Sequence, residues 1–198
     1  MYRRFALAAA ALAALSVAGT VSAQSVAEFY KGKTITIISG GSAGGGFTTV
    51  ARVLGMTWEK YIPGNPKIII DAKPGAGGAT MMSYMANAGK KDGTELGAAL
   101  PIAVNAPLLR KVKFNAADFH WLGSVTPMTE VSSVWHTAPA KSIDEAKKVE
   151  VIMATSSKLS SAYLIPAFVN AVAGTKFKIV PGYRGGGPMN KAMLNGEV

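Results

Sequence analysis

Apolar runs and glycine-rich loops alternate along the chain from residue 30 onward. The run Thr34–Ile38 is continuous and β-branched, which is typical of a strand buried on both faces. A glycine-rich loop at 40–46 follows it, and apolar residues at three- and four-residue spacing from Val50 to Tyr61 then predict a helix. That helix is expected to stop at Pro63-Gly64. The order of strand, glycine loop and helix predicts one crossover unit of a parallel sheet.

The same pattern repeats directly downstream. Lys67–Asp71 is predicted as a second buried strand, and Pro74–Gly78 forms a second glycine loop. The apolar face of residues 81–88 predicts a second helix. Asp92-Gly93 marks a turn into a third strand at 96–100. Strands that alternate with helices in this way favour an α/β fold built on a parallel sheet.

The second half of the chain repeats the pattern less regularly. Further strands are predicted at residues 119–125, 131–136, 149–154 and 177–180. Further helices are predicted at 105–110, at 162–172 and from Pro188 onward. Ser142 and Glu145 have the spacing of a capping box, so another helix should start there. A second α/β unit is therefore expected to begin near residue 131.

The N-terminus has the features of a secretory signal peptide. Arg3 and Arg4 precede an apolar run at 5–17, and Val21-Ser22-Ala23 supplies small residues in the order that signal peptidase cleaves. The apolar run is about 13 residues long, shorter than the roughly 20 that a membrane-spanning helix needs. We expect residues 1–23 to be removed after Ala23 and the rest of the chain to be periplasmic.

Composition narrows the chemistry further. The chain contains no cysteine, which excludes disulfides, thiolate metal sites and cysteine nucleophiles. Its net charge is +10, which favours anionic ligands through long-range attraction. The basic residues are scattered singly or in pairs such as Lys90-Lys91, without a basic helix or aromatic-interleaved patch, so nucleic acid is not an expected partner.

The glycine loops between strands and helices are the best candidates for binding chemistry. The first amides of a helix lack partners within the helix and carry partial positive charge, and glycine lets a ligand approach that backbone closely. Anions bind at such places without a cationic side chain. In open α/β sheets these loops converge beyond the carboxyl ends of the strands. The loops at 44–46 and 75–78 therefore predict an anion pocket.

Motifs that would indicate nucleotide binding, catalysis or metal binding are missing from the sequence. No register of residues 40–49 supplies the three spaced glycines of a dinucleotide fingerprint, and Phe47-Thr48 stands where a P-loop needs its lysine. His120 and His136 are the only histidines, and without a nucleophile elbow they are interpreted as structural. No clustered ligands predict a metal site. The sequence gives no indication of a cofactor or of a catalytic residue.

Several ordered motifs together resemble one transport family. They are Ala43–Gly46 leading to Val50-Ala51-Arg52, Pro74–Gly78, Asp92-Gly93-Thr94, Phe119–Ser124, Val134–Thr137, Phe177–Val180 and Gly182–Gly186. This combination resembles the substrate-binding receptors of tripartite tricarboxylate transporters, also called Bug-type receptors. The similarity extends over the whole chain beyond the signal segment.

The resemblance implies a two-lobed, type II-like Venus-flytrap fold of the periplasmic binding proteins. Residues 24–130 would form the N-terminal part of the first lobe, and 131–198 would form part of the second. Members of the family are longer than 198 residues. We therefore expect a C-terminally truncated chain, with the second lobe and the returning part of the first lobe incomplete.

The resemblance also implies which residues bind the ligand, eleven in all from the two lobes. They are Gly45, Gly46, Phe47 and Thr48 in the first loop, Gly75, Ala76 and Gly77 in the second, and Ser156, Ser157, Tyr183 and Gly185 from the other lobe. The family usually has an aspartate at position 48. The hydroxyl of Thr48 can still cap the helix, but a ligand ammonium would lose its counter-charge. Dicarboxylates, tricarboxylates and aromatic acids stay open as ligands.

These observations predict a monomeric receptor that captures a small organic anion and delivers it to the permease subunits of a membrane transporter. Hinge closure would bury the anion between the lobes, without a covalent step. Two alternatives remain at this point. One is a periplasmic α/β enzyme acting on an anionic substrate, and the other is a ligand-sensing accessory protein for a membrane kinase.

Overall fold

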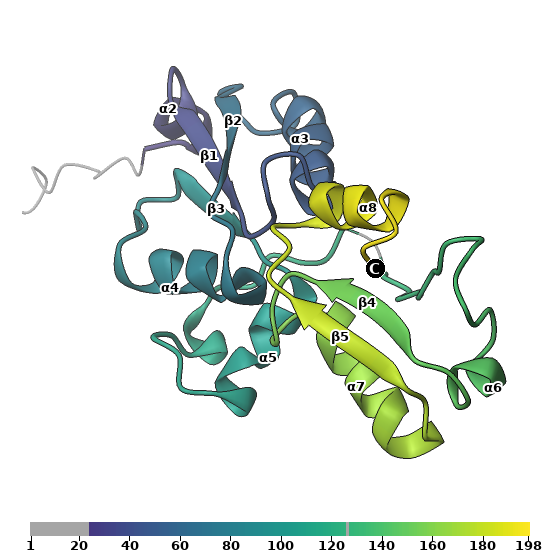
Figure 1. Ribbon diagram of the computed structural model, residues 1–198. Helices are drawn as coiled ribbons and strands as arrows, with labels where there is room; N and C mark the ends of the chain where they lie inside the picture. Colours follow the sequence, from purple (N-terminus) through teal and green to yellow (C-terminus); the bar gives the residue numbers. More distant parts are fainter. Residues whose placement is uncertain (1–23, 126) are drawn as a thin grey trace, which may run out of the picture.

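The computed structural model describes residues 24–125 and 127–198, which form two lobes that each contain a parallel sheet (Figure 1). The predicted signal peptide lies outside the described residues. Within them, no helix combines the length and the apolar character that crossing a bilayer requires.

The sheet of the first lobe has three parallel strands in the order β2-β1-β3. They are β1 (Thr34–Ser39), β2 (Lys67–Ala72) and β3 (Glu95–Ala98). The middle strand β1 is buried as predicted, and Ile38 is only 2% exposed. The prediction of a fully buried strand at 67–71 is wrong, because β2 is the edge of the sheet and alternates between half-buried and exposed residues.

Two helices cover opposite faces of this sheet. Helix α3 (Gly46–Trp58) packs through Gly55, where a Cβ would lie 3.1 Å from Ile68 and 3.2 Å from Ile70. Helix α4 (Ala79–Asn87) covers the other face, where Met81 packs with Ile38 in the core. The apolar positions that predicted α3 do not form its core-facing side. The buried residues of α3 are Thr48, Ala51 and Gly55, because only small side chains fit against the isoleucines of the sheet.

The sheet of the second lobe consists of two parallel strands, β4 (Val151–Thr155) and β5 (Phe177–Pro181). Helix α7 (Ser161–Ala173) connects them and ends at Gly174, whose φ of 71° is the left-handed conformation typical of a C-cap. Helix α8 (Gly186–Leu194) follows β5, and Figure 1 shows it returning to the region between the lobes. Short helix α6 (Ile143–Ala146) precedes the sheet and starts at Ser142 as predicted.

The remaining described elements are short. They are α2 (Val26–Tyr30), the 3₁₀ turn η1 (Ala76–Gly78), α5 (Pro101–Leu109) and the 3₁₀ turn η2 (Ala116–Asp118). Helix α5 starts four residues earlier than the predicted 105–110, because Pro101 suits the first turn of a helix, where its missing N–H is not needed.

Two predicted strands are wrong. The segments 119–125 and 131–136 contain no β-strand in the structure. Both have the apolar and β-branched residues of a strand, but a strand exists only when a neighbour completes its hydrogen-bond ladder. Neither segment has such a neighbour in the described part of the chain.

The two lobes are in direct contact. Leu159, in the loop after β4, is buried against Ala79 and Ala106 of the first lobe. Gly77 lies beneath the same loop, and a Cβ at this position would come within 2.9 Å of the Leu159 carbonyl oxygen. The loop of the second lobe is therefore packed into the surface of the first.

Candidate ligand-binding cleft

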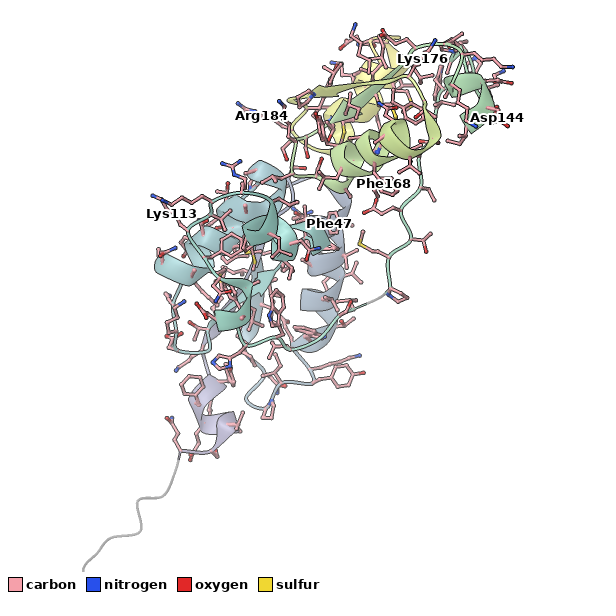
Figure 2. All side chains as sticks on the ribbon, turned by 90° about the horizontal axis from the view of Figure 1, so that it is seen from below. Phe47, Lys113, Asp144, Phe168, Lys176 and Arg184 are labelled. Atoms are coloured by element: carbon pink, nitrogen blue, oxygen red, sulfur yellow. The ribbon has the colours of Figure 1, made fainter. Side chains whose placement is uncertain are left out.

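A cleft of about 1790 Å³ extends along the first lobe from the segment that precedes β3 and continues between the two lobes. Its walls include the loops that follow β1, β2, β4 and β5, which are the carboxyl ends of four parallel strands. Figure 2 shows Phe47 on the side of the first lobe that faces the second. This is the edge at which parallel α/β sheets bind ligands.

Nine of the eleven predicted binding residues line this cleft. They are Gly45, Gly46, Phe47, Gly75, Ala76, Gly77, Ser156, Tyr183 and Gly185. The structure thus brings together loops that are up to 140 residues apart in the sequence. Thr48 and Ser157 are not part of the lining.

Thr48 points into the first lobe. It is 1% exposed, and its hydroxyl forms a hydrogen bond of 2.8 Å with the hydroxyl of Ser39 at the end of β1. The expectation that Thr48 caps α3 is wrong, because the N-cap is Gly45, which has no side chain to donate or accept. The Thr48 hydroxyl instead ties the start of α3 to the end of β1.

Ser157 shapes the loop after β4 from behind. Its hydroxyl accepts a bond of 3.3 Å from the Leu159 amide, and its carbonyl accepts one of 2.8 Å from the Ser160 hydroxyl. The Ser160 hydroxyl also lies 2.5 Å from that of Thr155, the last residue of β4. These contacts fold the loop so that Ser156 and Ser160 reach the cleft.

Five of the described helices begin at this cleft without a side-chain cap. The N-caps of α3, α4, α5, α7 and α8 are Gly45, Gly78, Leu100, Ser160 and Gly185, and all five residues line it. None of them makes a side-chain capping bond; three are glycines, one is a leucine, and the Ser160 hydroxyl is engaged with Thr155. The first amides of α3, α7 and α8 therefore have neither an intrahelical nor a side-chain partner. In α4, by contrast, the Ala79 amide donates to the Ala76 carbonyl and the Thr80 amide to the Gly75 carbonyl (3.4 Å), and α5 begins with Pro101, which has no amide hydrogen.

The two other helices in the described part of the chain, α2 and α6, are capped. Ser25 and Glu28 form a complete capping box at α2, and the Ser142 hydroxyl accepts the Glu145 amide at α6. Neither helix lines the cleft. Uncapped amides are thus gathered in the cleft, where their partial positive charges favour an anion.

Arg52 supports the first glycine loop from outside the cleft. Its guanidinium donates a hydrogen bond of 2.9 Å to the carbonyl of Ala43. The arginine sits on α3 and the carbonyl lies in the loop that precedes it, so the bond fixes the loop to its own helix. Arg52 belongs to one of the family-like motifs, and the structure gives it a positioning role.

Charged side chains at the cleft have both signs. Lys90, Lys91 and Arg184 line it, and so do Glu95, Asp118 and Glu130. The Glu95 carboxylate is already engaged, because it accepts bonds from the Tyr84 hydroxyl (3.2 Å) and the Lys90 amide (2.9 Å). Partial desolvation, followed by the negative charge of Glu95, raises the pKa of Tyr84, so its hydroxyl stays protonated.

One wall of the cleft is apolar, and the sequence patterns did not assign it to the site. Val50, Leu54 and Trp58 of α3 line it together with Ile37 and Leu96, which are paired in register on the α3 side of the sheet. The three- and four-residue spacing of Val50, Leu54 and Trp58 predicted a helix. Which side of that helix borders the cleft depends on the packing of its Gly55 against β2, which the spacing does not reveal.

Sequence reasoning also missed Ser42, Ser160 and Arg184. All three line the cleft from loops that contain predicted residues. The available signal was the position of Ser42 and Arg184 next to glycines and that of Ser160 in a serine-rich loop. No group of three or more His, Cys, Asp or Glu residues suited to a metal ion occurs within 24–125 and 127–198.

No protein-family model and no curated protein matches the sequence. Solved structures do share its fold. One is described as R. palustris Rpa4515 with adipate, with a TM-score of 0.66 at 22% identity, covering 84% of this chain and 57% of that one. Another is described as a periplasmic transporter, with a TM-score of 0.64 at 24% identity, covering 85% of this chain and 58% of that one.

The chain thus spans less than two thirds of the length of these solved proteins. At such identities the likeness establishes the fold. The predicted α/β class with two lobes is confirmed, and the chain has the fold of a periplasmic binding protein.

Proposed function

We propose that the chain is the solute-binding receptor of a tripartite tricarboxylate-type transporter in the periplasm. It captures a small organic anion, a carboxylate, between its lobes and presents it to the permease subunits in the membrane. Binding is reversible and involves no covalent step. The residues that hold the ligand are the nine predicted ones that line the cleft, with Thr48 and Ser157 supporting the loops from behind.

The uncapped helix N-termini carry this proposal. Five helices from both lobes begin at one cleft without a side-chain cap, and in α3, α7 and α8 the first amides have no intrahelical or side-chain partner, whereas α2 and α6, outside the cleft, are capped by serines. The side chains that line the cleft have mixed charge, so the selectivity for an anion comes from backbone amides.

The apolar wall suits the hydrocarbon part of an organic acid. Val50, Leu54 and Trp58 offer a surface that a carbon chain or ring can cover, while the carboxylate faces the glycine loops. The likeness to a protein described with adipate supports this ligand class, because adipate joins two carboxylates by an apolar chain. The motif resemblance to Bug-type receptors and the predicted signal peptide support the transporter and the compartment.

Isothermal titration calorimetry of the purified chain tests the proposal. The panel contains adipate, citrate and benzoate, and 1,4-diaminobutane is the control, since it has a carbon spacer like that of adipate but positive ends. We expect at least one carboxylate to bind and the diamine to give no heat. NMR of the bound acid after incubation should show it unchanged. Silence across all carboxylates, or turnover of one of them, contradicts the proposal.

A further inference from the structure

Ser42 occupies a tight turn at the start of the first glycine loop. Its carbonyl accepts a hydrogen bond of 2.9 Å from the Gly45 amide, and its side chain lines the cleft. A Cβ at Gly45 would come within 2.8 Å of the Ser42 hydroxyl oxygen. The absence of a side chain at Gly45 is therefore what leaves room for the hydroxyl.

Gly185 of the second lobe meets the same hydroxyl from the other side. A Cβ at Gly185 would collide with the Ser42 hydroxyl oxygen and would lie 3.1 Å from the Ser42 Cβ. Gly185 precedes α8, and the Gly185 amide donates 2.9 Å to the Tyr183 carbonyl. Ser42 is thus held between a glycine of each lobe, at the point where the lobes meet.

The Ser42 hydroxyl has no hydrogen-bond partner among the residues that the structure describes. By contrast, the hydroxyls of Ser39 and Ser160 in neighbouring loops are bonded within the protein. A half-buried hydroxyl that borders a cleft, with glycines on both sides, is free to donate its proton to a group in that cleft.

We propose that Ser42 is a ligand-binding residue at the junction of the lobes, which donates its hydroxyl proton to an oxygen of the bound carboxylate. Gly45 and Gly185 keep the space around this hydroxyl open, so that the lobes close only with small residues at both positions. This inference rests on the proposed function. It assigns to the chain a binding contact that the family-like motifs do not include.

Isothermal titration calorimetry of Ser42 variants tests whether this hydroxyl binds the carboxylate. With adipate, citrate and benzoate as probes, Ser42→Ala should bind the preferred acid roughly tenfold to a hundredfold more weakly, the loss expected for a hydrogen bond to a charged group. Ser132→Ala is the matched control, because Ser132 is exposed and lies outside this cleft, and its affinity should be unchanged. Equal affinity of Ser42→Ala and the unmodified chain overturns the inference.

Gly185→Ala and Gly182→Ala test whether the contact between Gly185 and Ser42 requires a residue without a side chain. Both glycines have a positive φ, 103° and 120°, but a Cβ at Gly182 meets nothing within 4 Å. Alanine strains the backbone at both positions, while only Gly185→Ala also collides with Ser42. We expect Gly185→Ala to weaken binding by about tenfold and to keep the lobes apart in small-angle X-ray scattering with ligand. Equal losses in both variants overturn the role of the contact.

A double variant separates collision from strain. In a Ser42→Gly background the collision is gone and only the backbone strain remains, so Gly185→Ala should weaken binding no more than Gly182→Ala does. A full additional loss contradicts the inference. If the unmodified chain binds none of the three acids, the proposed function itself fails; if it binds one and the Ser42 variants bind it equally well, only this inference fails.

Discussion

The two lobes present the same kind of loop to the cleft but differ in how their sheets are buried. In the first lobe, β1 lies between two strands and two helices, and Ile35, Ile37 and Ile38 are all buried. In the second lobe the sheet has two strands, and no residue of β5 is buried. The first strand of each sheet, β1 and β4, nevertheless ends in a buried hydroxyl pair, Ser39 with Thr48 and Thr155 with Ser160.

This difference indicates that the stability of the chain and the geometry of its cleft loops have different physical origins. Burial of apolar surface scales with the number of covered strands, so the first lobe should provide most of the free energy of unfolding. The loops depend instead on short local bonds between a strand end and the next helix, which need only one strand and one helix. Substitutions and titrations matched between the two lobes test this division.

The largest effect is expected from matched isoleucine truncations. Ile38→Ala in β1 removes a side chain that is 2% exposed and should lower the free energy of unfolding by about 3–4 kcal/mol. Ile152→Ala in β4 removes one that is 39% exposed and should cost less than about 1 kcal/mol. Urea unfolding measures both. Equal losses would show that the second lobe is as well covered as the first.

The second-largest effect is expected at the contact between the lobes. Leu159 is 9% exposed and packs on Ala79 and Ala106, so Leu159→Ala should destabilise the chain by about 2–3 kcal/mol. Because this side chain joins the lobes, their unfolding should also become less cooperative, with separate transitions by fluorescence and circular dichroism. Leu122→Ala is the control, since Leu122 is 77% exposed and should change stability by less than about 0.5 kcal/mol.

The hydroxyl pairs should behave alike in both lobes. Thr48→Val and Thr155→Val each keep the shape of the side chain but remove one member of a buried pair, which should cost about 1–2 kcal/mol in each case. Each substitution should also weaken carboxylate binding, because the loop after the strand loses its anchor. A loss confined to the first lobe would mean that the loop of the second lobe is held by Leu159 alone.

The smallest effects concern two exposed carboxylates, one in each lobe. The hydroxyl and amide of Thr94 hold the pKa of Asp92 below its ordinary value, and a hydrogen bond from Lys147, followed by its positive charge, does the same for Asp144. A lowered pKa contributes stability above the ordinary carboxyl pKa, and this contribution is lost as the pH falls through the lowered value.

Carboxyl-carbon NMR titrations in low and high salt distinguish the cause of the lowered pKa of Asp92 from that of Asp144. Added salt should move the pKa of Asp144 back toward its ordinary value more than that of Asp92, because an ion pair is screened more than a bond to a neutral hydroxyl. Thr94→Val should raise the pKa of Asp92 and leave that of Asp144 unchanged. A salt response equal at both sites would contradict this assignment of causes.

Local features were predictable to different degrees. The strand at 34–38, the glycine loops and the end of α7 at Gly174 follow from short-range rules on β-branched runs and glycine conformation, and the structure confirms them. The strands at 119–125 and 131–136 were predicted from equally good local patterns and are wrong, because pairing depends on a partner that no local pattern reveals. The buried orientation of Thr48 depends likewise on Ser39, nine residues away in sequence.

The sequence alone determined the alternation of strand, loop and helix, the lack of cysteine chemistry and the positions of the glycine loops, because these depend on neighbouring residues and composition. Only the tertiary structure decided which side of α3 borders the cleft, which hydroxyls serve as internal anchors and which, like that of Ser42, stay unpartnered. The physical reason is that burial and pairing are properties of two surfaces in contact, and a surface acquires its partner only when distant segments fold together.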